Sequence, residues 1–369
     1  MIIGILAIAP DAHGSANNRK DNPTMTNNQC INNSNIEMTT LSNRANSLQL
    51  KESFNAQMPC NINDHKENNA TMKYIRKEWG VTNKYFYGAD DISFVDDPFT
   101  PDSNDKTLRV LYEKGSFSPQ ATRRQKNDVS GGAEFYARPF NGTYKRGLLS
   151  YEIAFDDSFK WVKGGKLPGL YGGEPTSGCS GGDKADGEKC FSVRMMWRSQ
   201  GKAEAYAYLP PEDDAVCENS KVICNDEYGT SIGRGLINFT QKKWSKIEIY
   251  TVMNDPDQHN GELTVWQDNR TVIDLKGLVF RTQTTLGVSS ILFSTFFGGS
   301  SKEYATPIDT YTYFKNIQFS VADPEQSEPS NTESAASSPL LISFSSINMV
   351  WLTTTTITAI LFFMNFFDQ

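Results

Sequence analysis

Between about residues 71 and 322, hydrophobic and β-branched residues occur in short runs that Gly, Asn, Asp and Pro separate. Alternation with a period of two is typical of strands that bury one face, and the separating residues are typical of turns. Hardly any segment keeps a helical period, so the pattern predicts an all-β fold, a jelly-roll β-sandwich of antiparallel sheets. The runs that fit best are residues 108–112, 133–137, 147–155, 191–198, 203–209, 246–252, 261–267 and 289–297.

The two ends of the chain lack this pattern. Residues 1–70 are rich in Asn, Thr and Ser, which predicts a disordered lead before a sandwich domain over residues 71–322. The apolar start is short and no basic residue precedes it, as in a damaged signal peptide. Residues 323–338 read as a linker, and residues 339–369 as a hydrophobic tail.

The tail predicts how the protein is attached to a membrane. Its apolar run begins near Ile347 and spans about 30 Å as a helix, enough to cross a bilayer. No Lys or Arg follows the run, and small residues at 334–337 precede it, which favours a GPI signal over a single transmembrane anchor. We therefore expect a secreted or cell-surface protein that contacts the membrane only through this tail.

One predicted hairpin brings polar side chains together. Along residues 191–198, a period of two places Ser192 and Arg194 on the face opposite an apolar set. On the next run, Tyr206 and Tyr208 share a face. An odd turn such as residues 200–202 pairs Arg194 with Tyr208, so these four side chains form one patch. From spacing alone, an ordinary exposed sheet face accounts for the patch equally well.

A glycine-rich segment precedes this hairpin at residues 161–173. It contains five glycines, and Lys163 and Lys166 bracket a Gly-Gly step. Such glycines indicate a backbone that approaches something closely, here with cations beside it, although a flexible turn is also possible. The segment is not a P-loop, because it lacks the GK[ST] step into a helix.

Charge and composition narrow the chemistry. The chain has 36 Lys and Arg against 43 Asp and Glu, a formal charge of −7, and no basic cluster, which excludes a nucleic-acid partner. Its 3 histidines lie far apart, so neither a histidine metal centre nor a histidine relay is expected. Asp255 and Asp257 read as loop acids, and we expect no metal and no cofactor.

The cysteines and glycosylation sequons indicate an oxidising compartment. The simplest of fifteen possible pairings joins Cys179 to Cys190 and Cys217 to Cys224, each bond closing one polar loop. The pairing of the remaining two cysteines stays open. Asn-X-Ser/Thr sequons occur at Asn32, Asn69, Asn141, Asn238 and Asn269, and we expect glycans on the last three.

An ordered series of motifs resembles polysaccharide lyase family 14, the alginate and glucuronan lyase type, particularly its fungal members. The series covers most of residues 71–322 and leaves both ends outside. Its segments are VLYEKGSFSP at 110–119, KGGKLPGLYGG at 163–173, CSGG at 179–182, FSVRMMWR at 191–198, YAYLP at 206–210, GRG at 233–235, NGEL at 260–263 and TFFGG at 295–299.

The resemblance implies a β jelly roll that cleaves uronate-containing polysaccharide by β-elimination, without a cofactor and as a monomer. The family's functional residues are a lysine near the glycine-rich strand, a serine and an arginine two apart, and a Tyr-x-Tyr pair. On this chain they correspond to Lys166, Ser192, Arg194, Tyr206 and Tyr208. Lys163 is the alternative to Lys166, and the further candidate substrate-binding residues are Lys163, Arg198 and Trp266.

These residue types suit proton abstraction from a uronic acid. Arg194 and a lysine can neutralise the carboxylate, because removal of the C5 proton creates an enolate-like dianion. A tyrosine can then act as base or acid, and as a base it needs a pKa lowered by those cations. Two other classes remain: a non-catalytic carbohydrate-binding jelly roll that stacks sugars on Tyr206, Tyr208 and Trp266, and a glycoside hydrolase, for which Glu204 is the only suitable acid.

Overall fold

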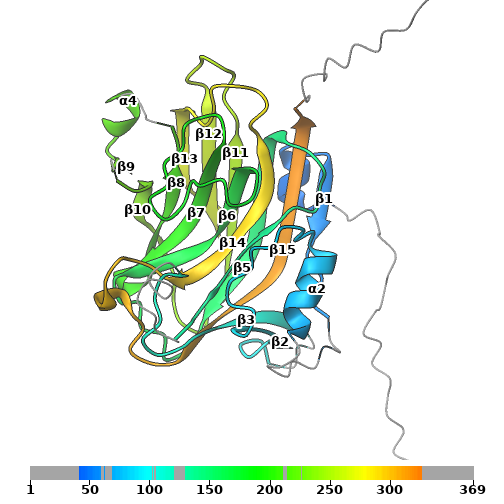
Figure 1. The fold of residues 1–369 in the computed structure, drawn as a ribbon, viewed down its shortest axis with the longest axis vertical. Helices are drawn as coiled ribbons and strands as arrows, with labels where there is room; N and C mark the ends of the chain where they lie inside the picture. The colour runs from blue at the N-terminus through cyan, green and yellow to red at the C-terminus, as the bar shows by residue number, and fades with distance from the viewer. Residues whose placement is uncertain are drawn as a thin grey trace, which may run out of the picture. The chain divides into compact units, whose positions relative to one another are not determined.

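The computed structural model describes residues 41–59, 62, 69–101, 103, 105–119, 129–210, 214–225 and 227–325. Their strands form one continuous antiparallel hydrogen-bonded system that folds into two layers, a jelly-roll β-sandwich (Figure 1). In Figure 1 the yellow strand β14 curves beside the green strands β6 and β7, and the orange strand β15 runs next to the blue β1. The predicted fold class is confirmed.

We call the first layer the front layer. Its strands follow the order β4-β14-β6-β7-β8-β10-β9, and every neighbouring pair is antiparallel. The bounds are β4 Ala133–Ala137, β14 Val288–Phe297, β6 Gly164–Gly173, β7 Cys190–Arg198, β8 Lys202–Tyr208, β10 Thr230–Asn238 and β9 Val222–Ile223.

The second layer, which we call the back layer, follows the order β13-β12-β11-β5-β15-β3-β2, and β1 pairs with β15. One residue pair, Val288 with Tyr144, links β14 to β5 and so joins the two layers. The bounds are β13 Arg270–Leu278, β12 Gly261–Gln267, β11 Ser245–Val252, β5 Tyr144–Phe155, β15 Thr310–Pro324, β3 Lys106–Tyr112, β2 Ile92–Asp96 and β1 Glu52–Asn55.

The hydrophobic core lies between the layers, where the alternating apolar positions of both meet. The Trp197 ring of β7 lies 6.1 Å from the Phe155 ring of β5. The Phe293 ring of β14 lies 5.0 Å from the Phe314 ring of β15. Each strand therefore turns its other face outward, and the outer faces carry the polar chemistry.

The ordered fold begins earlier than the sequence predicted, because part of the expected lead folds onto the back layer. Helix α1 (Asn43–Ser47) and strand β1 lie within residues 1–70, and β1 completes the sheet beside β15. Both elements are too short to show a period in the sequence. Further helices whose bounds the structure describes are α2 (Ala70–Glu78), α4 (Asp214–Cys217) and the 3-10 turns Ser199–Gly201 and Lys302–Tyr304.

All eight predicted runs are strands, with ends that differ by three residues or fewer. Both predicted disulfides, Cys179–Cys190 and Cys217–Cys224, are present. In the part of the chain that the structure describes, no helix is long and apolar enough to cross a membrane. The hydrophobic tail, the linker from residue 326 onward, Cys30, Cys60 and Asn32 lie outside the described residues.

Candidate active site

The outer face of the front layer gathers the predicted site residues. On β7, Phe191, Val193, Met195 and Trp197 enter the core, so Ser192, Arg194, Met196 and Arg198 point outward. Strand β8 runs beside β7 and adds Tyr206 and Tyr208, whose rings meet edge to face with centroids 5.9 Å apart. The patch predicted from the period of two therefore exists.

The register of this hairpin differs from the prediction by two residues. Arg194 pairs with Tyr206 and Ser192 with Tyr208, whereas the expected turn paired Arg194 with Tyr208. The turn is Ser199–Gly201, in which Gln200 and Gly201 have φ angles of 63° and 77°. Because the shift is even, every side chain keeps its predicted face.

Strand β6 brings Lys166 to the same face, opposite Met196 of β7. Two of its glycines allow close packing between strands: a Cβ on Gly165 would lie 2.1 Å from the Trp197 ring, and one on Gly169 would lie 2.0 Å from the Val193 carbonyl oxygen. The register shifts between Leu167 and Gly169, so a strict period of two does not hold along β6.

Arg194 is a buried cation with spare hydrogen-bonding capacity. Its side chain is 1% exposed. Nη1 lies 3.7 Å from the carboxylate of Glu134 and 3.4 Å from the hydroxyl of Ser294, and the guanidinium lies 5.9 Å from the Tyr208 ring. Among the residues that the structure describes, Nε and Nη2 find no acceptor. A buried donor without an acceptor is costly, so this end of Arg194 is suited to a ligand carboxylate.

Lys166 lies in an environment that disfavours its charged form. Nζ contacts the Met196 sulfur at 3.2 Å and lies 3.4 Å from the centre of the Tyr206 ring. Burial lowers the pKa of Lys166 well below its usual value, and the charges of Arg194 and Arg198 add to this effect. A lysine of lowered pKa can accept a proton near neutral pH.

The tyrosine pair is held by backbone donors. The Tyr206 hydroxyl accepts a hydrogen bond from the Gly229 amide at 3.1 Å, and the Tyr208 hydroxyl accepts one from the Gly182 amide at 3.0 Å. The expected lowering of the pKa by nearby cations is wrong for Tyr206. Burial raises the pKa of Tyr206 and outweighs the opposing charges of Arg194 and Arg198, so this residue suits a proton donor.

The Cys179–Cys190 disulfide loop borders the site. Ser192, fully buried, donates its hydroxyl proton to the Cys179 carbonyl oxygen at 2.6 Å. Gly182 of the same loop donates to Tyr208, as described above. Ser192 therefore holds the loop against β7.

Comparison with known proteins identifies the family. The family model Polysaccharide lyase 14 matches residues 100–317, more than half of the chain. The chain belongs to polysaccharide lyase family 14. The crystal structure of the marine PL-14 alginate lyase from Aplysia kurodai is 34% identical, covers 67% of this chain and 94% of that chain, and superposes with a TM-score of 0.58.

Two further solved structures share the fold of this lyase. Alginate lyase Aly36B is 20% identical over 74% of this chain and 98% of that chain, with a TM-score of 0.54. Alginate lyase vAL-1 from Chlorella virus is 23% identical over 68% of this chain and 97% of that chain, with a TM-score of 0.52. A comparison with curated protein sequences gave no match.

Two of the predicted substrate-binding residues lie away from the Arg194 patch. Lys163 is exposed, forms an ion pair with Glu303 and lies 5.3 Å from the Tyr304 ring, so Lys166 is the lysine that the structure brings to Arg194.

Trp266 belongs to the outer face of the back layer, where the guanidinium of Arg44 lies 4.2 Å from its ring. Trp266 does not join the Arg194 patch. Arg198 lies at the patch and binds Glu204.

The sequence reasoning missed the contribution of β4. Glu134 lies opposite Ser294 of β14, is 8% exposed, and accepts a hydrogen bond from the Tyr85 hydroxyl at 2.7 Å. Burial raises the pKa of Tyr136, two residues along, to about 12. The alternation of residues 133–137 indicates that Glu134 and Tyr136 share a face, but only the pairing with β14 reveals which face.

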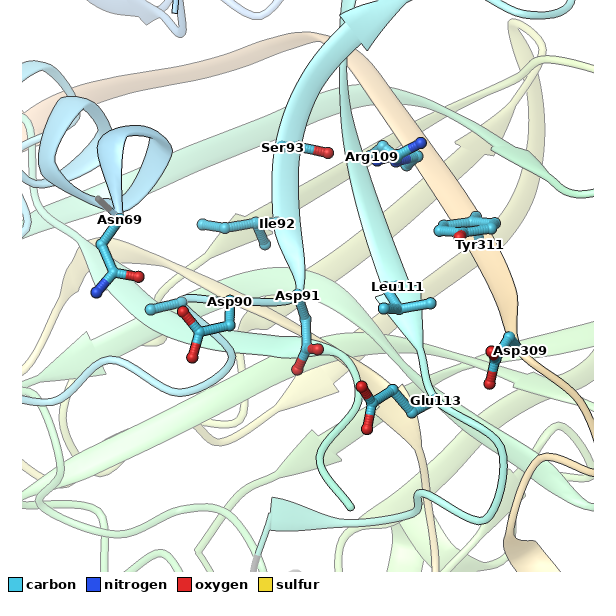
Figure 2. A pocket seen from close by; sticks show the side chains of 11 residues that line it. Asn69, Asp90, Asp91, Ile92, Ser93, Arg109, Leu111, Glu113, Asp309 and Tyr311 are labelled. Carbon is cyan, nitrogen blue, oxygen red and sulfur yellow. The ribbon is translucent and has the colours of Figure 1, made fainter. Parts of the chain in front are cut away.

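A separate cavity of about 400 Å³ lies against β2, β3 and β15 (Figure 2). Acidic side chains outnumber basic ones in its lining, where the Arg109 guanidinium lies 4.9 Å from the centre of the Tyr311 ring. Its acidic residues are Asp90, Asp91, Glu113 and Asp309. This lining would repel a polyanion, so the cavity is not the place for one. Across the described ranges, no group of three or more His, Cys, Asp or Glu residues is arranged to hold a metal ion.

Proposed function

We propose that this lyase cleaves an acidic polysaccharide of the alginate type, a chain of 1,4-linked uronates, by β-elimination. One observation carries the proposal. Arg194 is fully buried and charged, and its Nε and Nη2 are unpaired in the described part of the chain. A uronate carboxylate supplies two oxygens in the geometry of that guanidinium edge. The similarity to solved alginate lyases supports the same substrate class.

In the elimination step, Arg194 neutralises the carboxylate on C5 and stabilises the charge that grows there when the C5 proton leaves. The unprotonated amine of Lys166 accepts this proton. The C5–H electron pair becomes the C4–C5 double bond, and the bond between C4 and the glycosidic oxygen breaks. The lowered pKa of Lys166 makes the unprotonated amine available for this role.

The leaving oxygen takes a proton from the tyrosine pair. Burial raises the pKa of Tyr206 above its ordinary value, so this residue keeps its proton at neutral pH and above. Each hydroxyl oxygen of the pair already accepts a hydrogen bond from a backbone amide, so the hydroxyl's own proton is free to be donated into the site. Proton transfer from Tyr206 or Tyr208 to the glycosidic oxygen completes the balance, and one chain becomes two.

A hydrolase mechanism fits the same residues poorly. The two carboxylates at the site are both engaged by arginines: Glu204 by Arg198 and Arg234, and Glu134 by Arg194. A glycoside hydrolase needs one carboxyl group that holds a proton for the leaving oxygen. Both carboxylates instead serve as acceptors for guanidinium groups, so these residues favour elimination.

The test is digestion of polymannuronate, polyguluronate and polyglucuronate, each followed by ultraviolet absorbance. A lyase produces the absorbance of an unsaturated uronate conjugated with its carboxyl group. A hydrolase gives saturated ends, and a carbohydrate-binding protein binds the polymer without shortening it. Arg270→Ala, a change at an exposed arginine of β13, serves as the control for Arg194→Ala.

We also propose that the mature lyase is exposed at the cell surface through a GPI anchor. The two disulfides and the exposure of Asn141, Asn238 and Asn269 support an oxidising, glycosylating route. Phosphatidylinositol-specific phospholipase should release the protein from intact cells. Retention together with an intact C-terminal peptide would show a transmembrane anchor instead.

A further inference from the structure

A buried carboxylate next to Lys166 holds two arginines that the elimination step does not use. Glu204 is 0% exposed and lies opposite Met196 in the β7–β8 pair. Nε of Arg198 donates to Glu204 Oε1 at 2.9 Å, and Nε of Arg234 donates to Oε2 at 2.7 Å. The Ser231 hydroxyl also donates to Oε2, at 2.8 Å.

The backbone of β10 is shaped to present Arg234. Pairing between β10 and β8 is interrupted between Ile232 and Ile237, so the chain bulges there. Gly233 and Gly235 flank Arg234 with φ angles of 67° and 83°, a region that glycine adopts without strain. The GRG sequence thus forms the bulge, which carries Arg234 to the outer face beside Glu204.

The charges of this network do not cancel. Two guanidinium groups share one carboxylate, which leaves one positive charge in excess. The Arg234 side chain is 47% exposed and uses Nε for its bonds to Glu204 and Ser231. Arg198 is 21% exposed in its side chain and uses Nε and Nη2 for Glu204. The excess charge therefore faces the outside at the same surface as Lys166.

We propose that Arg198 and Arg234 form a second carboxylate-binding position of the lyase, occupied by another uronate of the same polysaccharide chain. Arg194 and Arg198 lie four residues apart on one strand, about 13 Å, which is longer than one sugar ring. The two positions therefore engage different sugars. Glu204 is a positioning residue, because it holds both arginines. The inference rests on the proposed substrate class and extends it to chain length.

The experiment compares Arg234→Ala with the wild type on long polyuronate and on short oligouronates that reach only Arg194. We expect KM to rise about tenfold on the long chain, because a charge-assisted contact is lost. On short oligomers we expect KM to change less than twofold, and kcat to fall far less than KM rises on either substrate. Arg234→Lys should restore part of the affinity, and Arg270→Ala is the matched control.

Other readouts separate this role from a structural one. The KM of the wild type on long chains should rise more steeply with salt than that of Arg234→Ala, because one ionic contact is missing in the variant. An equal rise in KM on short and long substrates would overturn the proposal, because Arg234 would then act through Lys166. An unchanged KM on the long chain would also overturn it. The second position can also be tested without turnover, by titrating polyuronate into the inactive variant Lys166→Met with and without Arg234→Ala. Binding of the long chain should be weaker when Arg234 is absent.

Discussion

The two outer faces of the sandwich are built from similar side chains, yet only the front one leaves donors of its arginine without an acceptor among the described residues. On the back layer, Arg44 of α1 reaches Glu248 through Nε and Nη2, each at 3.3 Å, and its flat face covers Trp266. On the front layer, Arg194 stands near Glu134 and Tyr208, but Nε and Nη2 lack acceptors in the described residues.

The two faces differ in which groups accept hydrogen bonds from the arginine. On the back layer the chain itself covers the face and supplies the acceptor, because residues 41–50 fold over it and pack Ala45 and Leu50 against Tyr250 and Trp266. On the front layer we propose that a substrate carboxylate binds the donors that remain. An arginine beside a carboxylate and an aromatic ring therefore marks a site only when donors are left over.

The largest expected effect comes from Lys166→Met, which keeps the length of the side chain and removes the amine. Loss of the base should lower kcat by about 10³-fold or more. The same change should raise the thermal midpoint, because a cation disfavoured by burial is replaced by an apolar group. Kinetics and thermal denaturation measure both. Lys163→Met, at the exposed ion pair with Glu303, should be milder, and an equal loss there would contradict the assignment.

The pH dependence of kcat/KM follows from the same lysine. Lys166 acts unprotonated, so activity should rise with pH as its amine loses the proton. Since its pKa in the folded lyase is lowered, this rise should occur well below the usual range for lysine. In the window between the folded and unfolded pKa values the unfolded chain binds more protons, so stability should increase with pH there. The increase should be smaller in Lys166→Met.

A pair of arginine variants tests the comparison of the two faces directly. Arg194→Ala should lower kcat by about 10²- to 10³-fold and leave the circular dichroism spectrum unchanged. Arg44→Ala should leave kcat near the wild-type value and lower the thermal midpoint, because buried Glu248 loses a partner. If Arg44→Ala reduced turnover as much as Arg194→Ala, the distinction between the faces would fail.

Removing one hydroxyl from the tyrosine pair should have a smaller effect. Tyr206→Phe keeps the ring against Lys166 and removes the proton donor, so we expect kcat to fall about 100-fold while substrate affinity persists. Tyr208→Phe is the matched variant, and the larger loss of the two identifies the acid. Wild-type turnover in both variants would show that the proton comes from another group.

The disulfide beside Ser192 should have a modest effect on turnover. In Cys179→Ser/Cys190→Ser, the loop that supplies the Gly182 amide to Tyr208 is freed, and we expect kcat to fall about tenfold with little change in KM. The control is Cys217→Ser/Cys224→Ser, because the two hydrogen bonds to Tyr208 and Ser192 come from the 179–190 loop. Equal losses in both double variants would indicate general destabilisation, which thermal denaturation would reveal.

The smallest kinetic effect is expected at Trp266. Trp266→Ala should change kcat and KM less than twofold, because the ring lies under Arg44 on the back layer. Its cost should be in stability, about 3 kcal/mol or more for a buried tryptophan. A raised KM on polyuronate with an unchanged unfolding free energy would place sugars on the back layer.

The sequence predicted the strands and their faces well because alternation is a local property. It predicted the patch of Ser192, Arg194, Tyr206 and Tyr208 even though the register was two residues off. The register depended on Gln200, whose left-handed conformation in the turn leaves no mark in hydrophobicity.

One strand that escaped prediction interrupts its own period. Strand β15 changes register between Lys315 and Gln318, around Asn316 with a φ angle of 52°, and so hides the longest strand. The role of Glu134 depends on β14, a neighbour more than a hundred residues away. Pairing between strands so far apart in the sequence depends on the topology of the fold, which local sequence patterns do not reveal.

The site residues come from adjacent strands, β4, β14, β6, β7 and β8, joined edge to edge by their backbones. In such a sheet, the distance between hydrogen-bonded strands fixes the spacing of the reacting groups. Segments outside these strands can then vary without changing that spacing. Directed evolution of this lyase toward new chain lengths should therefore begin at the β10 bulge, and should leave these five strands and the 179–190 loop, whose Gly182 amide holds Tyr208, untouched.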